Sequence, residues 1–156
     1  MTQDIVKQIH STLIKKKKSV AAAESCTGGL LSYLLTRLSG SSRYFILGVV
    51  AYSNRAKQSI LKVPVRLLAK KGAVSAEVAR YLAKSVRKLA KSDLGIGITG
   101  IAGPTGATPQ KPVGTVFIAL SSSQKNICKK YYFKGNRAAI RKKAALESLK
   151  LLKITI

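Results

Sequence analysis

A short apolar run that ends in a cluster of small residues constrains the fold more than any other feature of the chain. Residues 20–29 are Val-Ala-Ala-Ala-Glu-Ser-Cys-Thr-Gly-Gly, and an apolar pattern with helical spacing begins at Leu30. We therefore predict a buried strand over residues 19–24 and a helix over residues 27–38. Ser25 then lies where the strand turns into the helix. Such a turn exposes the side chain, and the free N–H groups of a helix favour negative charge.

Similar patterns predict the remaining elements of an α/β fold. Apolar runs predict strands at residues 44–52, 94–99, 114–120 and 127–133. Helical spacing predicts a first helix that ends at the lysine run 15–18 and a last helix over 137–152. Early strands separated by helices, followed by a late strand pair, predict a three-layer α/β/α sandwich with a mixed, mostly parallel sheet of about five strands. The 156 residues suit a single domain over positions 1–156.

Two further helices are predicted from their capping residues. Asn54 is expected to cap a short helix that carries Lys57, and Ser75 a long one. The inward face of the long helix is predicted to consist of Val78, Leu82, Val86 and Leu89. The inward face of the last helix is predicted to include Ala145, Leu149 and Leu152.

The scarcity of histidine and acidic residues disfavours several kinds of active site. His10 is the only histidine, and the five acidic residues are scattered singly. A Ser–His pair, a pair of catalytic carboxylates and a metal cage are therefore not expected, and the base of an enzyme would be a lysine or a tyrosine. The chain has no apolar run of about 18 residues and no signal-peptide layout at its start, so we expect a cytosolic protein without a membrane span.

The net charge of +24, from 29 basic and 5 acidic residues, would attract polyanions. One interpretation is a partner such as nucleic acid or a phosphorylated substrate. The other is that the basic residues are spread over a solvated surface. No aromatic-rich binding sheet or recognition motif accompanies the charge, which favours the second interpretation.

Two glycine-rich segments lead to different interpretations. Residues 95–100 match the pattern G-x-G-x-x-G, but they lie inside a predicted strand with no helix after it. We interpret these glycines as sites where a helix packs closely on the strand, and not as a dinucleotide fingerprint. Residues 100–109 form a loop that would follow a parallel strand, so a binding role in the same crevice as Ser25 is expected.

Tyr52 and Lys57 follow the second predicted strand and can approach the same sheet edge as Ser25. A lysine acts as a base for serine only when it is partly neutral, and both desolvation and neighbouring cations favour this state. A tyrosine hydroxyl can relay or position the proton. The structural alternatives are a helix-capping serine, a surface lysine and a strand-end aromatic residue, and spacing alone does not decide between them.

Five separated motifs of this chain resemble the CinA C-terminal domain family in both order and spacing. They are Ala23–Gly29 (Ala-Glu-Ser-Cys-Thr-Gly-Gly), Tyr52-Ser53-Asn54 with Lys57, Gly72–Ser75, Thr99–Pro104 and Lys111–Val116. Single-domain members of this family act as nicotinamide-nucleotide amidohydrolases, which convert nicotinamide mononucleotide and water to nicotinic acid mononucleotide and ammonia. The resemblance implies this reaction, the three-layer fold and a homo-oligomer, and it implies that no metal or organic cofactor is needed. The alternative is a non-catalytic competence or DNA-damage module that binds nucleic acid through its basic surface.

The resemblance also implies roles for individual residues. Ser25 would be the nucleophile, Lys57 the base that activates it, and Tyr52 an aid to proton transfer. The substrate and the oxyanion would be contacted by Thr27, Gly28, Thr99, Gly100 and Arg137, with Arg137 suited to a phosphate and Arg141 as a second candidate. Three positions depart from the family pattern, namely Ala107, Gln110 and Asn136. They concern substrate binding and leave the proposed catalytic residues intact.

Overall fold

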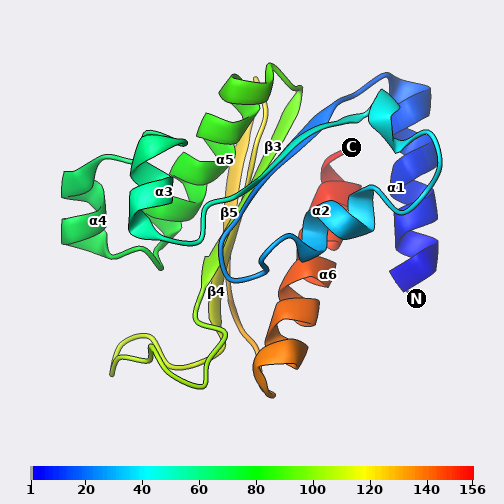
Figure 1. The fold of residues 1–156 in the computed structure, drawn as a ribbon. Coiled ribbons are helices and arrows are strands. Elements are labelled where there is room, and N and C mark those ends of the chain that lie inside the picture. The colour runs from blue at the N-terminus through cyan, green and yellow to red at the C-terminus, as the bar shows by residue number, and fades with distance from the viewer. Residues whose placement is uncertain (1) are drawn as a thin grey trace.

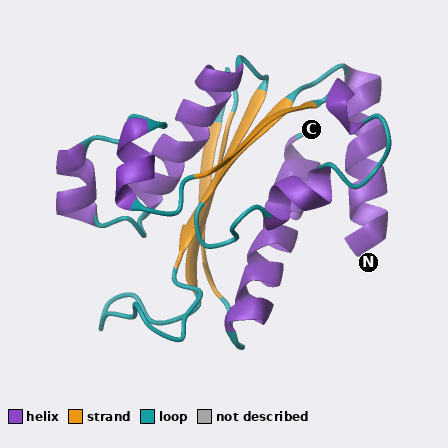
Figure 2. Cartoon of the chain, in the orientation of Figure 1, coloured by secondary structure: helices purple, strands orange, loops and turns teal. Residues whose placement is uncertain are grey.

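The computed structural model describes residues 2–156 and is built around one open sheet of five strands (Figures 1 and 2). The strands are β1 (Val20–Glu24), β2 (Phe45–Val50), β3 (Leu94–Gly100), β4 (Thr115–Ser121) and β5 (Asn126–Tyr132). Their order in the sheet is β2-β1-β3-β4-β5. β1 pairs in parallel with β2 and β3, whereas β4 is antiparallel to both β3 and β5. Four of the five strands therefore run in one direction, and β4 runs in the opposite one. The prediction of a mixed, mostly parallel sheet is confirmed.

Helices cover both faces of this sheet. They are α1 (Thr2–Lys16), α2 (Leu30–Leu35), α3 (Asn54–Ser59), α4 (Val65–Lys71), α5 (Ala76–Ala90) and α6 (Arg137–Thr155), with a 3-10 turn at Ser41–Arg43. Figure 1 shows α1, α2 and α6 on one face and α3, α4 and α5 on the other. Each layer has its own buried apolar cluster against the sheet. The predicted three-layer α/β/α sandwich is confirmed.

The glycines of β3 explain how closely α5 approaches the sheet. A Cβ atom on Gly97 would lie 2.3 Å from the Ala79 carbonyl oxygen, and one on Gly95 would lie 2.1 Å from the Ala83 carbonyl oxygen. Only glycine leaves room for the helix backbone at these two positions. This close packing confirms the structural interpretation of the G-x-G-x-x-G pattern.

Three details of the predicted helices were wrong. The helix expected over 27–38 covers only Leu30–Leu35: its start is delayed because Gly29 lies in the left-handed region with φ 93°, and it ends at the C-cap residue Thr36. The cap of α3 is Ser53 in place of Asn54, since the Ser53 hydroxyl accepts the Ala56 N–H. Leu89 is 54% exposed, because the four-residue spacing of the α5 core face continues to Ala90 instead.

Candidate active site

A cleft of about 280 Å³ lies at the edge of the sheet where β1 and β3 end. Six of the nine predicted site residues line it, namely Ser25, Tyr52, Lys57, Thr99, Gly100 and Arg137. Ser25 directly follows β1, and its N–H extends the strand pairing by donating to the Ile98 carbonyl oxygen at 3.1 Å. The strand thus fixes the backbone from which the candidate nucleophile projects.

Lys57 and Ser25 form the central contact of the cleft. The Lys57 amine lies 3.0 Å from the Ser25 hydroxyl oxygen and 2.9 Å from the Ala51 carbonyl oxygen, with the Tyr52 carbonyl oxygen at 3.4 Å. Lys57 is only 2% exposed, and Ser25 is 8% exposed. A long cationic side chain is rarely buried without a carboxylate partner, and none of the described contacts of Lys57 is to one.

This environment suits a lysine that acts as a base. Burial lowers the pKa of Lys57 below its ordinary value, because the charged form loses its hydration. A lower pKa raises the fraction of neutral amine near neutral pH, and only the neutral amine can accept the Ser25 proton. The geometry and the direction of the pKa shift therefore agree.

Cys26 is the other potential nucleophile that lines the cleft. Burial, as the largest influence, raises the pKa of its thiol to about 12. The thiolate is the reactive form of cysteine, so Cys26 stays an unreactive thiol near neutral pH. Of these two adjacent residues, Ser25 is therefore the better candidate nucleophile.

The open side of the cleft is formed by Tyr52 and Arg137. Tyr52 follows β2 and is 55% exposed, whereas Arg137 is the first residue of α6. The Arg137 guanidinium donates to the Tyr52 hydroxyl and, at 2.7 Å, to the Gly103 carbonyl oxygen. Elsewhere in the lining, the Thr99 hydroxyl donates to the Ala73 carbonyl oxygen at 2.7 Å. The cleft thus combines a buried Ser–Lys pair with a guanidinium at its mouth.

The other three predicted site residues form a group at the turn that carries Ser25. Thr27, Gly28 and Arg141 do not line the cleft. Thr27 is fully buried, and its hydroxyl has no hydrogen-bond partner among residues 2–156. The Arg141 guanidinium donates to the Thr27 carbonyl oxygen at 2.8 and 3.3 Å. Thr27 and Gly28 belong to the turn that carries Ser25, and Arg141 contacts this turn, so their role as substrate contacts stays a prediction.

The expected role of the helix start after Ser25 was wrong, and Glu24 is the reason. The fully buried Glu24 carboxylate accepts the N–H groups of Gly29, Leu31 and Ser32 and the Ser32 hydroxyl, at 2.7–3.1 Å. It therefore occupies the N-terminus of α2, which is no longer free to stabilise charge at Ser25. Residues 25–29 separate Glu24 from the start of α2 at Leu30, so the spacing alone did not predict this contact.

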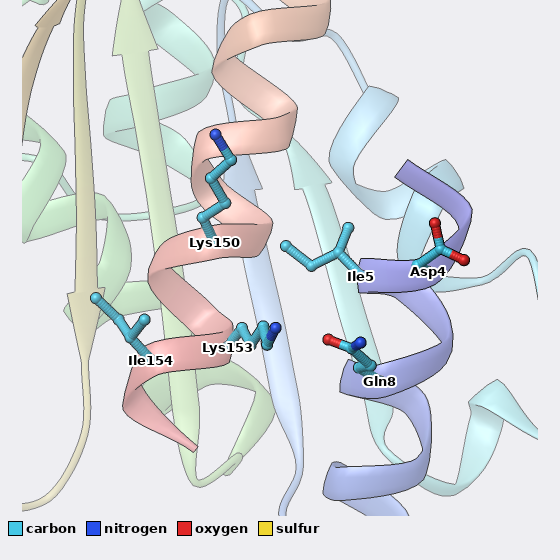
Figure 3. A pocket seen from close by; sticks show the side chains of 6 residues that line it. All are labelled: Asp4, Ile5, Gln8, Lys150, Lys153 and Ile154. Atoms are coloured by element: carbon cyan, nitrogen blue, oxygen red, sulfur yellow. The ribbon is translucent and has the colours of Figure 1, made fainter. Parts of the chain in front are cut away.

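A second hollow lies between α1 and α6, away from the cleft (Figure 3). Its lining consists of Asp4, Ile5, Gln8, Lys150, Lys153 and Ile154. None of these residues was predicted to belong to a site. Within residues 2–156, no cluster of three or more histidine, cysteine or acidic side chains could hold a metal ion, and no helix is long and apolar enough to cross a membrane.

The family to which this chain belongs follows from comparison with known proteins. The model of the CinA C-terminal domain matches residues 2–156. The chain belongs to the CinA C-terminal domain family. CinA-like proteins of an Anaeromyxobacter species and of Geobacter sulfurreducens are 49% and 50% identical to it, over 95% and 89% of the chain. The chain spans about a third of the length of these two relatives, 36% and 34%.

Solved structures of the CinA superfamily share the fold along almost their whole length. One from Klebsiella pneumoniae has a TM-score of 0.95 and 29% identity, and the match covers 99% of this chain and 97% of that one. One from Enterobacter cloacae has a TM-score of 0.94 and 33% identity, with 99% and 92% covered.

The three departures from the CinA family pattern lie outside the cleft lining. Ala107 and Gln110 are exposed in the loop between β3 and β4. Asn136 caps α6, and its side-chain oxygen accepts the Ala139 N–H at 2.9 Å. Asparagine and aspartate are about equally good at this position, so the start of α6 keeps its cap.

Proposed function

We propose that the chain is an amidohydrolase of the Ser–Lys type that converts nicotinamide mononucleotide and water to nicotinic acid mononucleotide and ammonia. The observation that carries the proposal is the 3.0 Å contact between the Lys57 amine and the Ser25 hydroxyl, buried at the base of a cleft. A nucleophile within hydrogen-bond reach of a base is the arrangement that nucleophilic catalysis requires. The family resemblance adds the substrate.

The proposed reaction runs in two halves. Neutral Lys57 takes the Ser25 proton as the Ser25 oxygen attacks the carboxamide carbon, and the resulting Lys57 ammonium gives that proton to the departing nitrogen. Ammonia leaves, and an ester joins Ser25 to the nicotinoyl group. Lys57 then takes a proton from water, which attacks the ester carbon. As the bond to the Ser25 oxygen breaks, the Lys57 ammonium returns that proton to this oxygen, so the acid is released and both the Ser25 hydroxyl and the neutral Lys57 are restored. The Tyr52 carbonyl oxygen lies 3.4 Å from the Lys57 amine, its hydroxyl accepts from Arg137, and Tyr52 is proposed to assist proton transfer.

Arg137 supports a substrate with a phosphate group. Its guanidinium lies at the mouth of the cleft, where a planar fork of donors suits phosphate oxygens. The amide end would then reach Ser25 while the phosphate stays near the surface. The proposed enzyme works in the cytosol as a homo-oligomer. Its proposed chemistry uses protein side chains and water, and it needs no metal or organic cofactor.

Ammonia release from nicotinamide mononucleotide tests the proposal directly. The wild type is expected to release ammonia, whereas Ser25→Ala keeps the fold but releases none. Arg137→Gln is expected to raise KM by about 10–100-fold, the cost of one or two hydrogen bonds to a charged group. Nicotinamide riboside, which lacks the phosphate, should be as poor a substrate for the wild type as for Arg137→Gln.

Other outcomes separate the alternatives. Equal turnover of the nucleotide and the riboside would indicate a different small-amide amidase. A folded wild type that releases no ammonia would contradict the proposal. Tight binding of a labelled DNA duplex that weakens steeply with salt and does not depend on Ser25 would support the binding-module alternative instead.

A further inference from the structure

The turn that carries Ser25 is held by side chains from two directions. Glu24 binds the start of α2 on one side, as described above. On the other side, Arg141 reaches across from α6 and donates twice to the Thr27 carbonyl oxygen, at 2.8 and 3.3 Å. The Gly28 N–H closes the turn by donating to the Ser25 carbonyl oxygen at 3.0 Å. Thr27 is thus inside the turn that begins at Ser25.

The contact between Arg141 and the turn is close as well as hydrogen-bonded. Gly28 has φ 58°, and a Cβ atom at this position would lie 3.0 Å from the Arg141 guanidinium nitrogen Nη2. The absence of a side chain at Gly28 therefore gives Arg141 access to the Thr27 carbonyl. Arg141 is partly buried and does not itself line the cleft.

α6 connects this contact to the substrate end of the cleft. Arg137 and Arg141 are four residues apart in the helix, so they lie on the same face, one turn from each other. Arg137 contacts the cleft loop through Gly103, and Arg141 contacts the nucleophile turn through Thr27. One rigid helix therefore fixes both the mouth of the cleft and the backbone beneath its nucleophile.

We infer that Arg141 is a positioning residue for Ser25, which acts through the Thr27 carbonyl and does not touch the substrate. The inference rests on the proposed role of Ser25 as the nucleophile. The Ser25 hydroxyl must keep its 3.0 Å contact with Lys57 while it attacks, and a displacement of about 1 Å in such a geometry can cost about 100-fold in rate. Loss of the Arg141 contact releases one side of the turn and lets Ser25 move away from Lys57.

The test measures two rates: the labelling of Ser25 by a probe in the absence of the substrate, and the turnover of nicotinamide mononucleotide. A fluorophosphonate probe forms a phosphorus–oxygen bond to an activated serine as fluoride leaves, and mass spectrometry locates the label. Arg141→Met removes the donors but keeps most of the side-chain length, whereas Arg141→Lys restores one donor and the charge. Lys142→Met is the matched control, because it removes one positive charge from the neighbouring exposed position of α6.

We expect Arg141→Met to slow Ser25 labelling and to lower kcat to a similar extent, about 10–100-fold, with KM changed less than about twofold. Arg141→Lys should recover part of both rates, and Lys142→Met should equal the wild type in both. The pH dependence of kcat should keep its midpoint in Arg141→Met, since the effect is on geometry and not on the charge of Lys57.

Each remaining outcome has a distinct meaning. Wild-type labelling and kcat in Arg141→Met, or a rise in KM alone, would overturn the inference, and the rise in KM would assign Arg141 to the substrate. Labelled wild type that does not hydrolyse the nucleotide would contradict the proposed function, while the labelling rates of the variants would still decide the role of Arg141. A wild type that is not labelled at Ser25 would overturn both.

Discussion

Replacement of Lys57 by methionine tests the chemistry of the cleft most directly. Methionine has a similar length and fills the buried space, but it has no amine to accept the Ser25 proton. General-base catalysis contributes about 100- to 10,000-fold to a rate, which corresponds to roughly 2.7–5.5 kcal/mol of transition-state stabilisation. Lys57→Met should therefore lower kcat/KM for nicotinamide mononucleotide by at least about 100-fold.

The pH dependence of kcat/KM in the wild type and in Lys57→Met makes this prediction more specific. Wild-type kcat/KM should rise with pH as Lys57 loses its proton, with a midpoint below the ordinary lysine pKa, because burial lowers the pKa of Lys57. Lys57→Met should show no such rise, and high pH should not restore its activity. Lys70→Met, at an exposed position of α4, is the matched control and should keep the wild-type profile.

The stability of the same pair of proteins provides an independent measurement. The folded pKa of Lys57 is lower than its unfolded value, so the unfolded chain binds more protons between the two values. The free energy of unfolding of the wild type, measured relative to Lys57→Met by urea titration, should rise with pH through this window. Two results together would refute the assignment of Lys57 as a buried base: a difference in the free energy of unfolding that does not change with pH, and a kcat/KM of Lys57→Met within tenfold of the wild type.

Three further predictions concern the framework around the site. Gly97→Ala should lower the free energy of unfolding by about 1–3 kcal/mol or more in a urea titration, because its Cβ would lie 2.3 Å from the Ala79 carbonyl oxygen; unchanged stability would contradict the close packing of α5. Glu24→Gln should destabilise the fold by about 1–3 kcal/mol in the same assay, since an amide nitrogen would face N–H donors at the start of α2, and no loss would mean that α2 needs no such cap. The Asp93 carboxylate accepts the Ser19 N–H at 2.8 Å, and this contact leads the influences that hold its pKa below the ordinary value. The stability that this carboxylate contributes is complete above the unfolded pKa and is lost as the pH falls through the folded pKa. The melting temperature of Asp93→Asn should therefore lie below that of the wild type at neutral pH, and the two melting temperatures should converge in acid.

The sequence predicted the layers of the fold well because its periodic patterns are strong. The buried run at β1 and the spacing of Val78, Leu82 and Val86 in α5 depend on local pattern alone. Boundaries near glycine were harder to predict, because the left-handed conformation of Gly29 starts α2 later than its apolar pattern suggests. The interpretation of residues 1–156 as one domain stays a prediction.

The candidate site was predictable where a side chain follows a strand and unpredictable where a contact crosses the fold. Glu24 was part of the motif that includes Ser25, but nothing in the spacing shows that its carboxylate turns back onto the start of α2. The contact between Arg141 and the Thr27 carbonyl joins residues 114 positions apart, and it depends on how α6 packs. Such backbone acceptors carry no signal in the sequence.

Strand direction explains why residues from distant parts of the chain meet at one edge of the sheet. β1, β2, β3 and β5 all run the same way, so their carboxyl ends lie at the same edge, where ligands bind in α/β sheets.

The segments that leave β1, β2 and β5 supply Ser25, Tyr52 and Arg137, and Thr99 lies within the last two residues of β3 itself. After β1 the chain passes to the α2 layer, and after β2 it passes to the α3 layer on the other face (Figure 1), so the edge between these two connections is left open. The opposed strand β4 begins at this edge and brings the loop that precedes it, including Gly103, to the cleft. Arg141 lies one turn further along α6 than Arg137, and it therefore contacts the turn that carries Ser25 through the Thr27 carbonyl although it does not line the cleft.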